Sequence, residues 1–285
     1  MAMRFQRIGV VGAGVIGSGV AQLFAQTGHD VVLIDISQQQ LDVARRNIAK
    51  NSRLFSLLQK DLGEGQQVVD HIRFSLDIKD ISDVDFVIEN VTEDWDMKRR
   101  LHNEIDELIS PGAPVAANTS AIPITKIASA GRHPERVIGM HFMNPVPLMP
   151  MVELIKGMHT SDDTISAARS LLEQAGRQTI LVNDSPGFVT NRVMMLMVNE
   201  AMFLVQEGVA PVQDVDRLFK TCFGHKMGPL ETADLIGLDT VLRSLDVIYA
   251  ELNDSKYRPC SLLKKMVYAG MNGRKSGKGF YDYNA

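Results

Sequence analysis

A glycine-rich turn near the start of the chain constrains the fold more than any other feature. An apolar segment at 7–11 is typical of a strand, a helical pattern covers 15–27, and Gly12-Ala13-Gly14-Val15-Ile16-Gly17 joins them. In this setting the first glycine permits a tight turn, the second lets the backbone approach a pyrophosphate, and the third packs helix on strand. The positive end of the helix dipole then faces the phosphates. The residues that we expect to contact a dinucleotide here are Gly12, Gly14, Val15, Ile16 and Gly17.

The end of the next strand indicates which dinucleotide is bound. That strand covers 31–35, and its last residue, Asp35, offers a carboxylate to the hydroxyls of an adenosine ribose. The same charge repels the additional phosphate of NADP, and the following Ile36 and Ser37 provide no arginine to hold it. The sequence therefore favours NAD as the cofactor. The alternative is that Asp35 only caps the helix that follows.

The apolar run at 8–21, preceded by Arg4 and Arg7, also fits a secretory signal peptide. Its glycines weaken a signal helix, so we favour a buried strand and turn. No stretch of the sequence reaches the roughly 18 apolar residues that a membrane-spanning helix needs. We therefore expect a cytoplasmic protein with no membrane partner.

Composition excludes several other classes of function. Hydrophobic residues make up 45% and charged residues 22% of the 285 residues, as in ordinary globular proteins. The net charge of -4 provides no basic field for nucleic acid, so we expect no nucleic-acid partner. Two cysteines, Cys222 and Cys260, are too few for a disulfide framework or, alone, a zinc site, so we expect no metal and a reducing environment.

Strand and helix patterns alternate as far as residue 183. This alternation predicts an α/β fold over 1–183, with a Rossmann-type, mostly parallel sheet covered by helices on both faces. Further strands are expected at 84–91, 115–118, 136–142, 151–155 and 179–182. From 184 to 285 the pattern predicts an all-helical C-terminal domain for substrate binding and dimerisation, entered through a long helix at 189–207. That helix carries methionines typical of a core or a subunit interface, Met194, Met195, Met197 and Met202.

His141 stands out among the seven histidines by its position. It lies at the end of an apolar strand, at the edge where parallel sheets bind ligands, and a proline-rich segment follows it. Glu153 lies within the next apolar strand, where an unpaired carboxylate is costly. If the chain returns beside itself, Glu153 meets His141 and orients it as a general base. The residues alone leave open the alternative of a buried structural pair.

Several short motifs are far more specific than the glycine turn. They are Asn118-Thr119-Ser120, His141-Phe142-Met143-Asn144-Pro145, Met151-Val152-Glu153, Asp184-Ser185-Pro186-Gly187-Phe188-Val189-Thr190-Asn191-Arg192, Gly228-Pro229-Leu230-Glu231, Gly237-Leu238-Asp239 and Gly277-Lys278-Gly279-Phe280-Tyr281. In order and spacing, over essentially the whole chain, they resemble the 3-hydroxyacyl-CoA dehydrogenases. The length is similar to the short two-domain form of the bacterial 3-hydroxybutyryl-CoA dehydrogenases.

The resemblance implies roles for individual residues. His141 is expected to be the general base in the oxidation of the 3-hydroxyl of an (S)-3-hydroxyacyl thioester, with Glu153 paired to it. Ser120 and Asn191 are expected to hold the substrate oxygen and to help position the nicotinamide. Asn144 is expected to support the histidine and the substrate. The remaining cofactor contacts that the resemblance implies are Glu93 and Lys98, near the nicotinamide ribose, together with Asn118 and Asn144.

The sequence departs from the family pattern around the expected catalytic loops. Ala121, Met143 and Pro150 stand where a serine, a phenylalanine and a lysine are usual, which puts the acyl preference in doubt. One alternative is a dehydrogenase of hydroxyacyl groups on acyl carrier proteins in polyketide biosynthesis. Another is a catalytically retired NAD-binding protein, which the intact His141 and Glu153 disfavour. The expected partners are therefore an acyl-CoA or acyl-carrier-protein thioester and a second copy of the chain in a homodimer.

Overall fold

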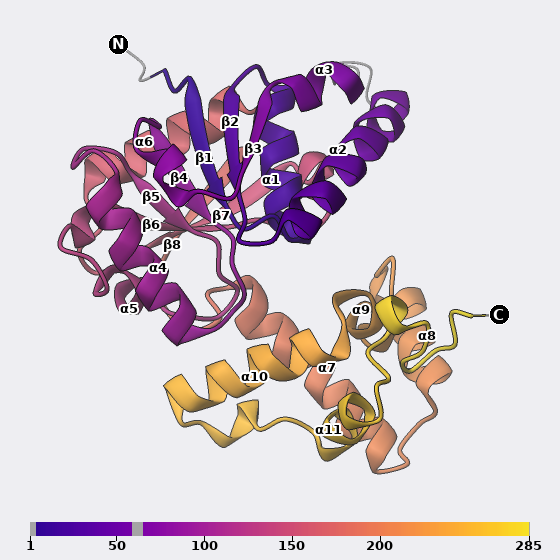
Figure 1. Cartoon of the computed structure of the whole chain (residues 1–285). Coiled ribbons are helices and arrows are strands. Elements are labelled where there is room, and N and C mark those ends of the chain that lie inside the picture. Colours follow the sequence, from indigo (N-terminus) through magenta and orange to yellow (C-terminus); the bar gives the residue numbers. More distant parts are fainter. Residues whose placement is uncertain (1–3, 59–64, 285) are drawn as a thin grey trace. The chain divides into compact units, whose positions relative to one another are not determined.

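The computed structural model describes residues 4–58 and 65–284. The chain folds into two compact units, Met1–Ser185 and Pro186–Ala285. The first unit combines strands and helices, and the second is built from helices (Figure 1). The expected fold class, a Rossmann-type sheet domain followed by a helical C-terminal domain, is confirmed.

The first unit contains an eight-stranded sheet in the order β3-β2-β1-β4-β5-β6-β7-β8. Its neighbouring strands are parallel except for β6 and β7, which run antiparallel. The strand order reverses between β1 and β4, so their carboxyl ends border the crevice where open sheets bind ligands. The strands are β1 (Arg7–Val11), β2 (Asp30–Ile34), β3 (Ile72–Ser75), β4 (Phe86–Glu89), β5 (Val115–Ala117), β6 (Val137–His141), β7 (Met151–Lys156) and β8 (Gln178–Asn183).

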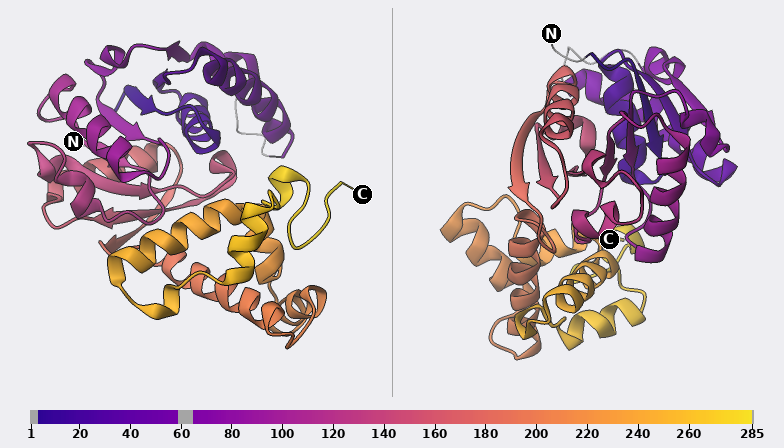
Figure 2. Two further views of the ribbon diagram at one scale, coloured as in Figure 1. Left: turned by 60° about the horizontal axis from the view of Figure 1, so that its bottom comes forward. Right: turned by 90° about the vertical axis from the view of Figure 1, so that its left-hand side faces the viewer.

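Helices cover both faces of this sheet (Figures 1 and 2). On one face the core joins helices α1, α2, α3 and α6 to alternate strand residues such as Met140 and Leu154. Because side chains alternate along a strand, His141 and Glu153 point to the opposite face, toward α4 and α5. The helices are α1 (Val15–Gln26), α2 (Gln38–Leu58), α3 (Gly65–Asp70), α4 (Trp95–Leu108), α5 (Ile124–Ala128) and α6 (Asp162–Gln174), with 3₁₀ turns η1 (Ile78–Ile81), η2 (Pro134–Arg136) and η3 (Val146–Leu148).

The structure differs from the sequence patterns in a few elements. The strand β3 was not expected: its four residues alternate apolar and polar side chains, but the segment is short and only Ile72 is buried. The strand expected at 84–91 is shorter, since β4 ends at Glu89 and the chain then turns toward α4. The segment that also fitted a signal peptide forms β1 and α1 of the sheet domain. Among the described helices, none is long and apolar enough to cross a membrane.

The second unit packs its helices around α7 (Thr190–Gln206). Met195 and Met202 of this helix are buried in its core, as expected of core methionines. Val193, on the same helix, is 64% exposed, and the expected homodimer stays a prediction. The other helices are α8 (Val212–Phe223), α9 (Pro229–Ile236), α10 (Leu238–Leu252) and α11 (Ser261–Tyr268), with 3₁₀ turns η4 (Ser255–Tyr257) and η5 (Arg274–Ser276).

Candidate active site

The glycine turn between β1 and α1 has the backbone geometry that a dinucleotide needs. Gly12 has a φ of +100°, and a Cβ atom there would lie 2.8 Å from the carbonyl oxygen of Asn90. A Cβ atom on Gly17 would collide with the carbonyl oxygen of Gly12, so α1 packs directly on the turn. Beside Gly14 no atom lies within 4 Å of a Cβ position, which leaves room for a pyrophosphate against the backbone. The next two residues, Val15 and Ile16, are exposed and half-buried in the first turn of α1.

Asp35 ties the end of β2 to this turn. Its Oδ2 accepts a hydrogen bond from Ala13 N at 2.8 Å, and its Oδ1 accepts one from Ser37 N at 3.0 Å. The cap contact at the start of α2 comes instead from Ser37, whose Oγ accepts a hydrogen bond from Gln40 N at 3.3 Å. The half-buried Asp35 carboxylate is therefore part of the glycine turn, and a carboxylate has further lone pairs for ribose hydroxyls.

His141 and Glu153 meet because the chain turns back after β6. The antiparallel register of β6 and β7 pairs these two residues directly, on the same face of the sheet. His141 Nδ1 lies 3.1 Å from Glu153 Oε2, and both side chains are buried. On the other side of the ring, Ser120 Oγ lies 3.2 Å from Nε2. The structure thus brings together three of the four expected catalytic residues in one hydrogen-bonded row.

Glu93 organises the loop that carries Ser120. Its Oε1 accepts hydrogen bonds from Thr119 Oγ1 at 2.5 Å, Ser120 N at 3.1 Å, Ala121 N at 2.8 Å and Ile122 N at 3.1 Å. Consecutive amides that converge on one anionic oxygen hold the loop in a single shape. Among the described residues, Glu93 Oε2 has no hydrogen-bond partner, which leaves that oxygen for a ligand.

Lys98 lies in a buried cluster, not in an open position for a ribose. Its Nζ donates to Glu89 Oε1 at 2.8 Å and Oε2 at 2.9 Å, and to the carbonyl oxygen of Asn118 at 3.2 Å. His102 Nε2 lies 3.0 Å from Glu89 Oε2, and the side chains of Lys98 and Glu89 are fully buried. The amino group of Lys98 is therefore not exposed for a direct contact with the nicotinamide ribose, because it is buried and bonded to Glu89.

The ionised form of Glu89 is stabilised within this cluster. Burial raises the pKa of the carboxyl, but the charge of Lys98 and the hydrogen bond with His102 outweigh burial, so the pKa lies below its usual range. Glu89 Oε1 also accepts a hydrogen bond from Val91 N at 2.6 Å, at the start of the segment that leads to Glu93. Sequence reasoning missed Glu89 and His102, and the cluster fixes the position of that segment.

Asn118 links three of the connections at this edge of the sheet. Its Nδ2 donates to Asn90 Oδ1 at 2.9 Å after β4, and its Oδ1 accepts from Phe142 N at 3.2 Å after β6. Asn144, on the segment that follows β6, is exposed. Asn191 belongs to the second unit, in the first turn of α7, so its expected contact with the substrate stays a prediction.

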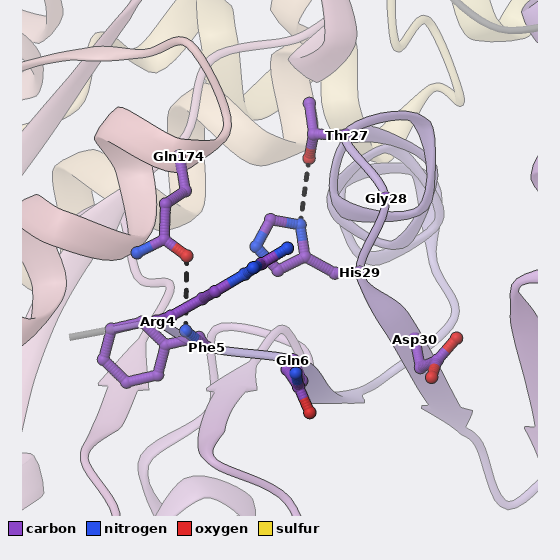
Figure 3. Close-up of a pocket in the computed structure, with 8 residues that line it drawn as sticks. All are labelled: Arg4, Phe5, Gln6, Thr27, Gly28, His29, Asp30 and Gln174. Carbon is purple, nitrogen blue, oxygen red and sulfur yellow. Dashed lines mark hydrogen bonds between the residues drawn. The ribbon is translucent and has the colours of Figure 1, made fainter. Parts of the chain in front are cut away.

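A separate pocket lies at the opposite edge of the sheet. Figure 3 shows it at the amino ends of β1 and β2, where Arg4, Gln6, His29 and Gln174 line a space of about 410 Å³. Burial lowers the pKa of His29, whose Nδ1 lies 3.1 Å from Thr27 Oγ1. The expected site residues follow the carboxyl ends of the strands, so this pocket is not part of the candidate active site.

Comparison with known proteins assigns the chain to a family. The model described as "3-hydroxyacyl-CoA dehydrogenase, NAD binding domain" matches residues 7–185, and the model of the C-terminal domain of the same family matches residues 187–283. A probable 3-hydroxybutyryl-CoA dehydrogenase of Deinococcus radiodurans is 45% identical, over 97% of this chain and 100% of its own length. A 3-hydroxybutyryl-CoA dehydrogenase of Bradyrhizobium diazoefficiens is 43% identical, over 99% of this chain and 97% of its own.

Solved structures agree with these sequence matches. The crystal structure of the (S)-3-hydroxybutyryl-CoA dehydrogenase of Ralstonia eutropha superposes with a TM-score of 0.90 and 41% identity, covering 98% of this chain and 99% of its own. The match extends across both units, so it does not rest on the dinucleotide fold alone. The chain belongs to the 3-hydroxyacyl-CoA dehydrogenase family and is an NAD-dependent oxidoreductase.

Proposed function

We propose that the chain oxidises the 3-hydroxyl of an (S)-3-hydroxyacyl-CoA, with (S)-3-hydroxybutyryl-CoA as the best candidate, to the 3-oxoacyl thioester. The observation that carries the proposal is the hydrogen-bonded row of Ser120, His141 and Glu153 at the carboxyl edge of the sheet. The relatives from Ralstonia and Bradyrhizobium carry a 3-hydroxybutyryl-CoA substrate in their names, which supports the choice of acyl group.

His141 acts as the general base, taking the proton of the substrate hydroxyl on Nε2. NAD, when bound, would supply the acceptor for the hydride that leaves the carbon bearing this hydroxyl. Glu153 accepts a hydrogen bond from Nδ1, which keeps Nε2 unprotonated in the neutral ring and stabilises the ring after it gains a proton. Ser120 donates its hydroxyl proton in a hydrogen bond to the substrate oxygen, where charge develops. Asn191 is expected to donate to the same oxygen, and Asn144 to support the substrate.

The residues of the first unit fit NAD. The turn from Gly12 to Gly17 and the first amides of α1 would hold the pyrophosphate, and Asp35 would hold the adenosine ribose. Glu93 would accept a hydrogen bond from the nicotinamide ribose on Oε2, since its Oε1 already serves the Ser120 loop. Lys98 would act from within the protein, by holding Glu89 and the carbonyl of Asn118, so its part in cofactor binding is indirect.

The thioester carrier is CoA in this proposal. The relatives named above act on CoA esters according to their names, and they do not favour the carrier-protein alternative. Exposed cations of α2 are candidate partners for the phosphates of CoA, namely Arg46, Lys50 and Arg53. Arg45, beside them, is stacked 4.2 Å above the ring of Phe74 and is therefore held against the domain.

A substrate panel tests the proposal directly. NADH formation is measured with (S)- and (R)-3-hydroxybutyryl-CoA, with longer 3-hydroxyacyl-CoA esters, and with the 3-hydroxybutyryl group on an acyl carrier protein. We expect turnover of the (S)-CoA ester, with a kcat/KM at least about tenfold above that of the (R)-isomer and of the carrier-protein substrate. A higher kcat/KM for the carrier-protein substrate would favour the acyl-carrier-protein alternative instead. Absence of turnover of every thioester would refute the proposed function.

Replacing Asp35 by alanine is expected to weaken the preference for NAD over NADP. The change removes both the acceptor for the ribose hydroxyls and the charge that repels the phosphate of NADP, so the ratio of the two kcat/KM values should fall about tenfold or more. Asp42→Ala, at an exposed carboxylate of α2, is the matched control and should leave the ratio unchanged. An unchanged ratio in the Asp35 variant would exclude the ribose role.

A further inference from the structure

The loop that carries Ser120 is held at a second point by a carboxylate that sequence reasoning gave no role. Asp184 directly follows β8, and its Oδ1 accepts a hydrogen bond from Ile124 N at 2.9 Å. Its Oδ2 accepts another from Thr125 N at 2.7 Å. We propose, on the basis of the proposed function, that Asp184 is a positioning residue that holds Ser120 in place beside His141.

The short helix α5 depends on this carboxylate. It begins at Ile124, directly after the Ser120 loop, and its cap residue Pro123 offers no side-chain acceptor. The first amides of a helix have no partner within the helix, and a single turn is not stable by itself. The two hydrogen bonds that the Asp184 carboxylate accepts from these amides therefore supply what the local sequence lacks. Between Glu93 at one end and Asp184 at the other, residues 119–125 are fixed on both sides.

Asp184 is itself fixed to the strand that carries Glu153. Its amide donates to the carbonyl oxygen of Lys156, the last residue of β7, at 3.0 Å. A second contact joins the same parts of the chain, since Met158 N donates to Thr125 Oγ1 at 3.0 Å. The segment that carries Ser120 and the strand that carries Glu153 are therefore held together by hydrogen bonds. Their hydroxyl and carboxylate groups lie on either side of the ring of His141.

This arrangement predicts an effect on turnover with little effect on NAD binding. Displacement of a reacting group by about 1 Å can cost a factor of about 100 in rate. The glycine turn and Asp35 make their hydrogen bonds with residues of α1, β2, β3 and the start of α2, away from Asp184. Loss of the Asp184 carboxylate should thus loosen the Ser120 loop and leave the glycine turn intact.

The test compares Asp184→Ala and Asp184→Asn with a matched cap variant. Asn keeps one oxygen acceptor, so it should retain more activity than Ala, and it keeps the test possible if the Ala variant does not fold. Ser161→Ala is the control, because Ser161 caps α6 by accepting a hydrogen bond from Thr164 N at 3.1 Å without contacting the Ser120 loop. Steady-state rates with (S)-3-hydroxybutyryl-CoA and NAD give kcat, and the KM for NAD is measured in the same series.

We expect Asp184→Ala to lower kcat by about 10- to 100-fold, with the KM for NAD changed less than about twofold. Ser161→Ala should lower the melting temperature while leaving kcat unchanged. Equal losses of kcat in the two variants, or full kcat in Asp184→Ala, would overturn the proposal.

Trp95 provides a readout that does not depend on turnover. It is the single tryptophan of the chain, and Lys126 Nζ of α5 lies 5.1 Å from its ring centroid. Loosening of α5 should expose this ring, so emission in Asp184→Ala should shift to longer wavelength and acrylamide should quench it more strongly. Ser161→Ala should keep the parent emission. Unchanged Trp95 fluorescence in Asp184→Ala would contradict the positioning role of Asp184, whether or not the wild-type protein is active. Absence of turnover of every thioester by the wild-type protein would instead refute the proposed function.

Discussion

Replacing His141 by glutamine should lower kcat by about 10²- to 10⁴-fold, the range usual for loss of a general base. Glutamine is similar in length and can still donate a hydrogen bond to Glu153, but it cannot accept the hydroxyl proton at neutral pH. The affinity for NAD should change little, because the dinucleotide turn and Asp35 make no hydrogen bond with this side chain. Steady-state NADH formation gives kcat, and titration of NADH fluorescence gives the affinity.

The matched control for this change is His159→Gln. His159 is exposed in the turn after β7, and the same substitution there should leave kcat at the wild-type value. A His141 variant with near-normal turnover would show that the pair with Glu153 is only structural. That outcome corresponds to the buried structural pair, the alternative that the residues alone left open. A catalytic pair and a structural pair have the same hydrogen bond, so kinetics is needed to distinguish them.

The contact between His141 and Glu153 could be predicted because it depends on short-range rules. Each residue lies in an apolar strand, and the loop between the strands is short enough for the chain to return beside itself. Alternation of side chains then places both on one face, and the register of β6 and β7 pairs them. The glycine turn was predictable for the same reason, since its three glycines act within one strand–turn–helix unit.

The supports of the site could not be predicted, because they join elements that are distant in sequence. Glu93 reaches the loop at 119–122, and Asp184 reaches the helix at 124–128, and no local pattern encodes either contact. The position expected for Lys98 beside the nicotinamide ribose came from the family resemblance, whereas a lysine in a helix is rarely fully buried. Its spacing did carry a signal, since Lys98, His102 and Ile105 fall on the one face of α4 that is buried.

Replacing Lys98 by methionine should destabilise the folded protein by about 3–5 kcal/mol, the cost of leaving a buried charge without its partner. Methionine has a similar volume, so the loss comes from Glu89, whose side chain is fully buried. Urea denaturation at neutral pH, followed by circular dichroism, measures it. Lys50→Met, at an exposed lysine of α2, is the matched control and should change the midpoint little. Adding Glu89→Gln to Lys98→Met should restore part of the stability, because the buried charge is then absent.

The pH dependence of this variant should have the opposite sign to that of the wild type. In the wild type the pKa of Glu89 is lowered from 4.5, so its contribution to stability is present above about pH 4.5 and is lost as the pH falls through the folded pKa. Without Lys98, burial dominates and raises the pKa of Glu89, so protonation relieves the buried charge.

The melting temperature of Lys98→Met should therefore rise as the pH is lowered from about 7 to about 5, while that of the wild type does not. Asp106 also makes stability depend on pH, and it does so in both proteins. Burial raises its pKa, but hydrogen bonds from Arg132 and Arg136 outweigh burial and lower the pKa. Its contribution cancels when the two melting curves are subtracted, since it lies in a separate set of contacts. If the melting temperatures of the two proteins changed with pH in parallel, Glu89 would not be an unpaired buried charge in the variant. Lys98 would then not be the group that keeps Glu89 ionised.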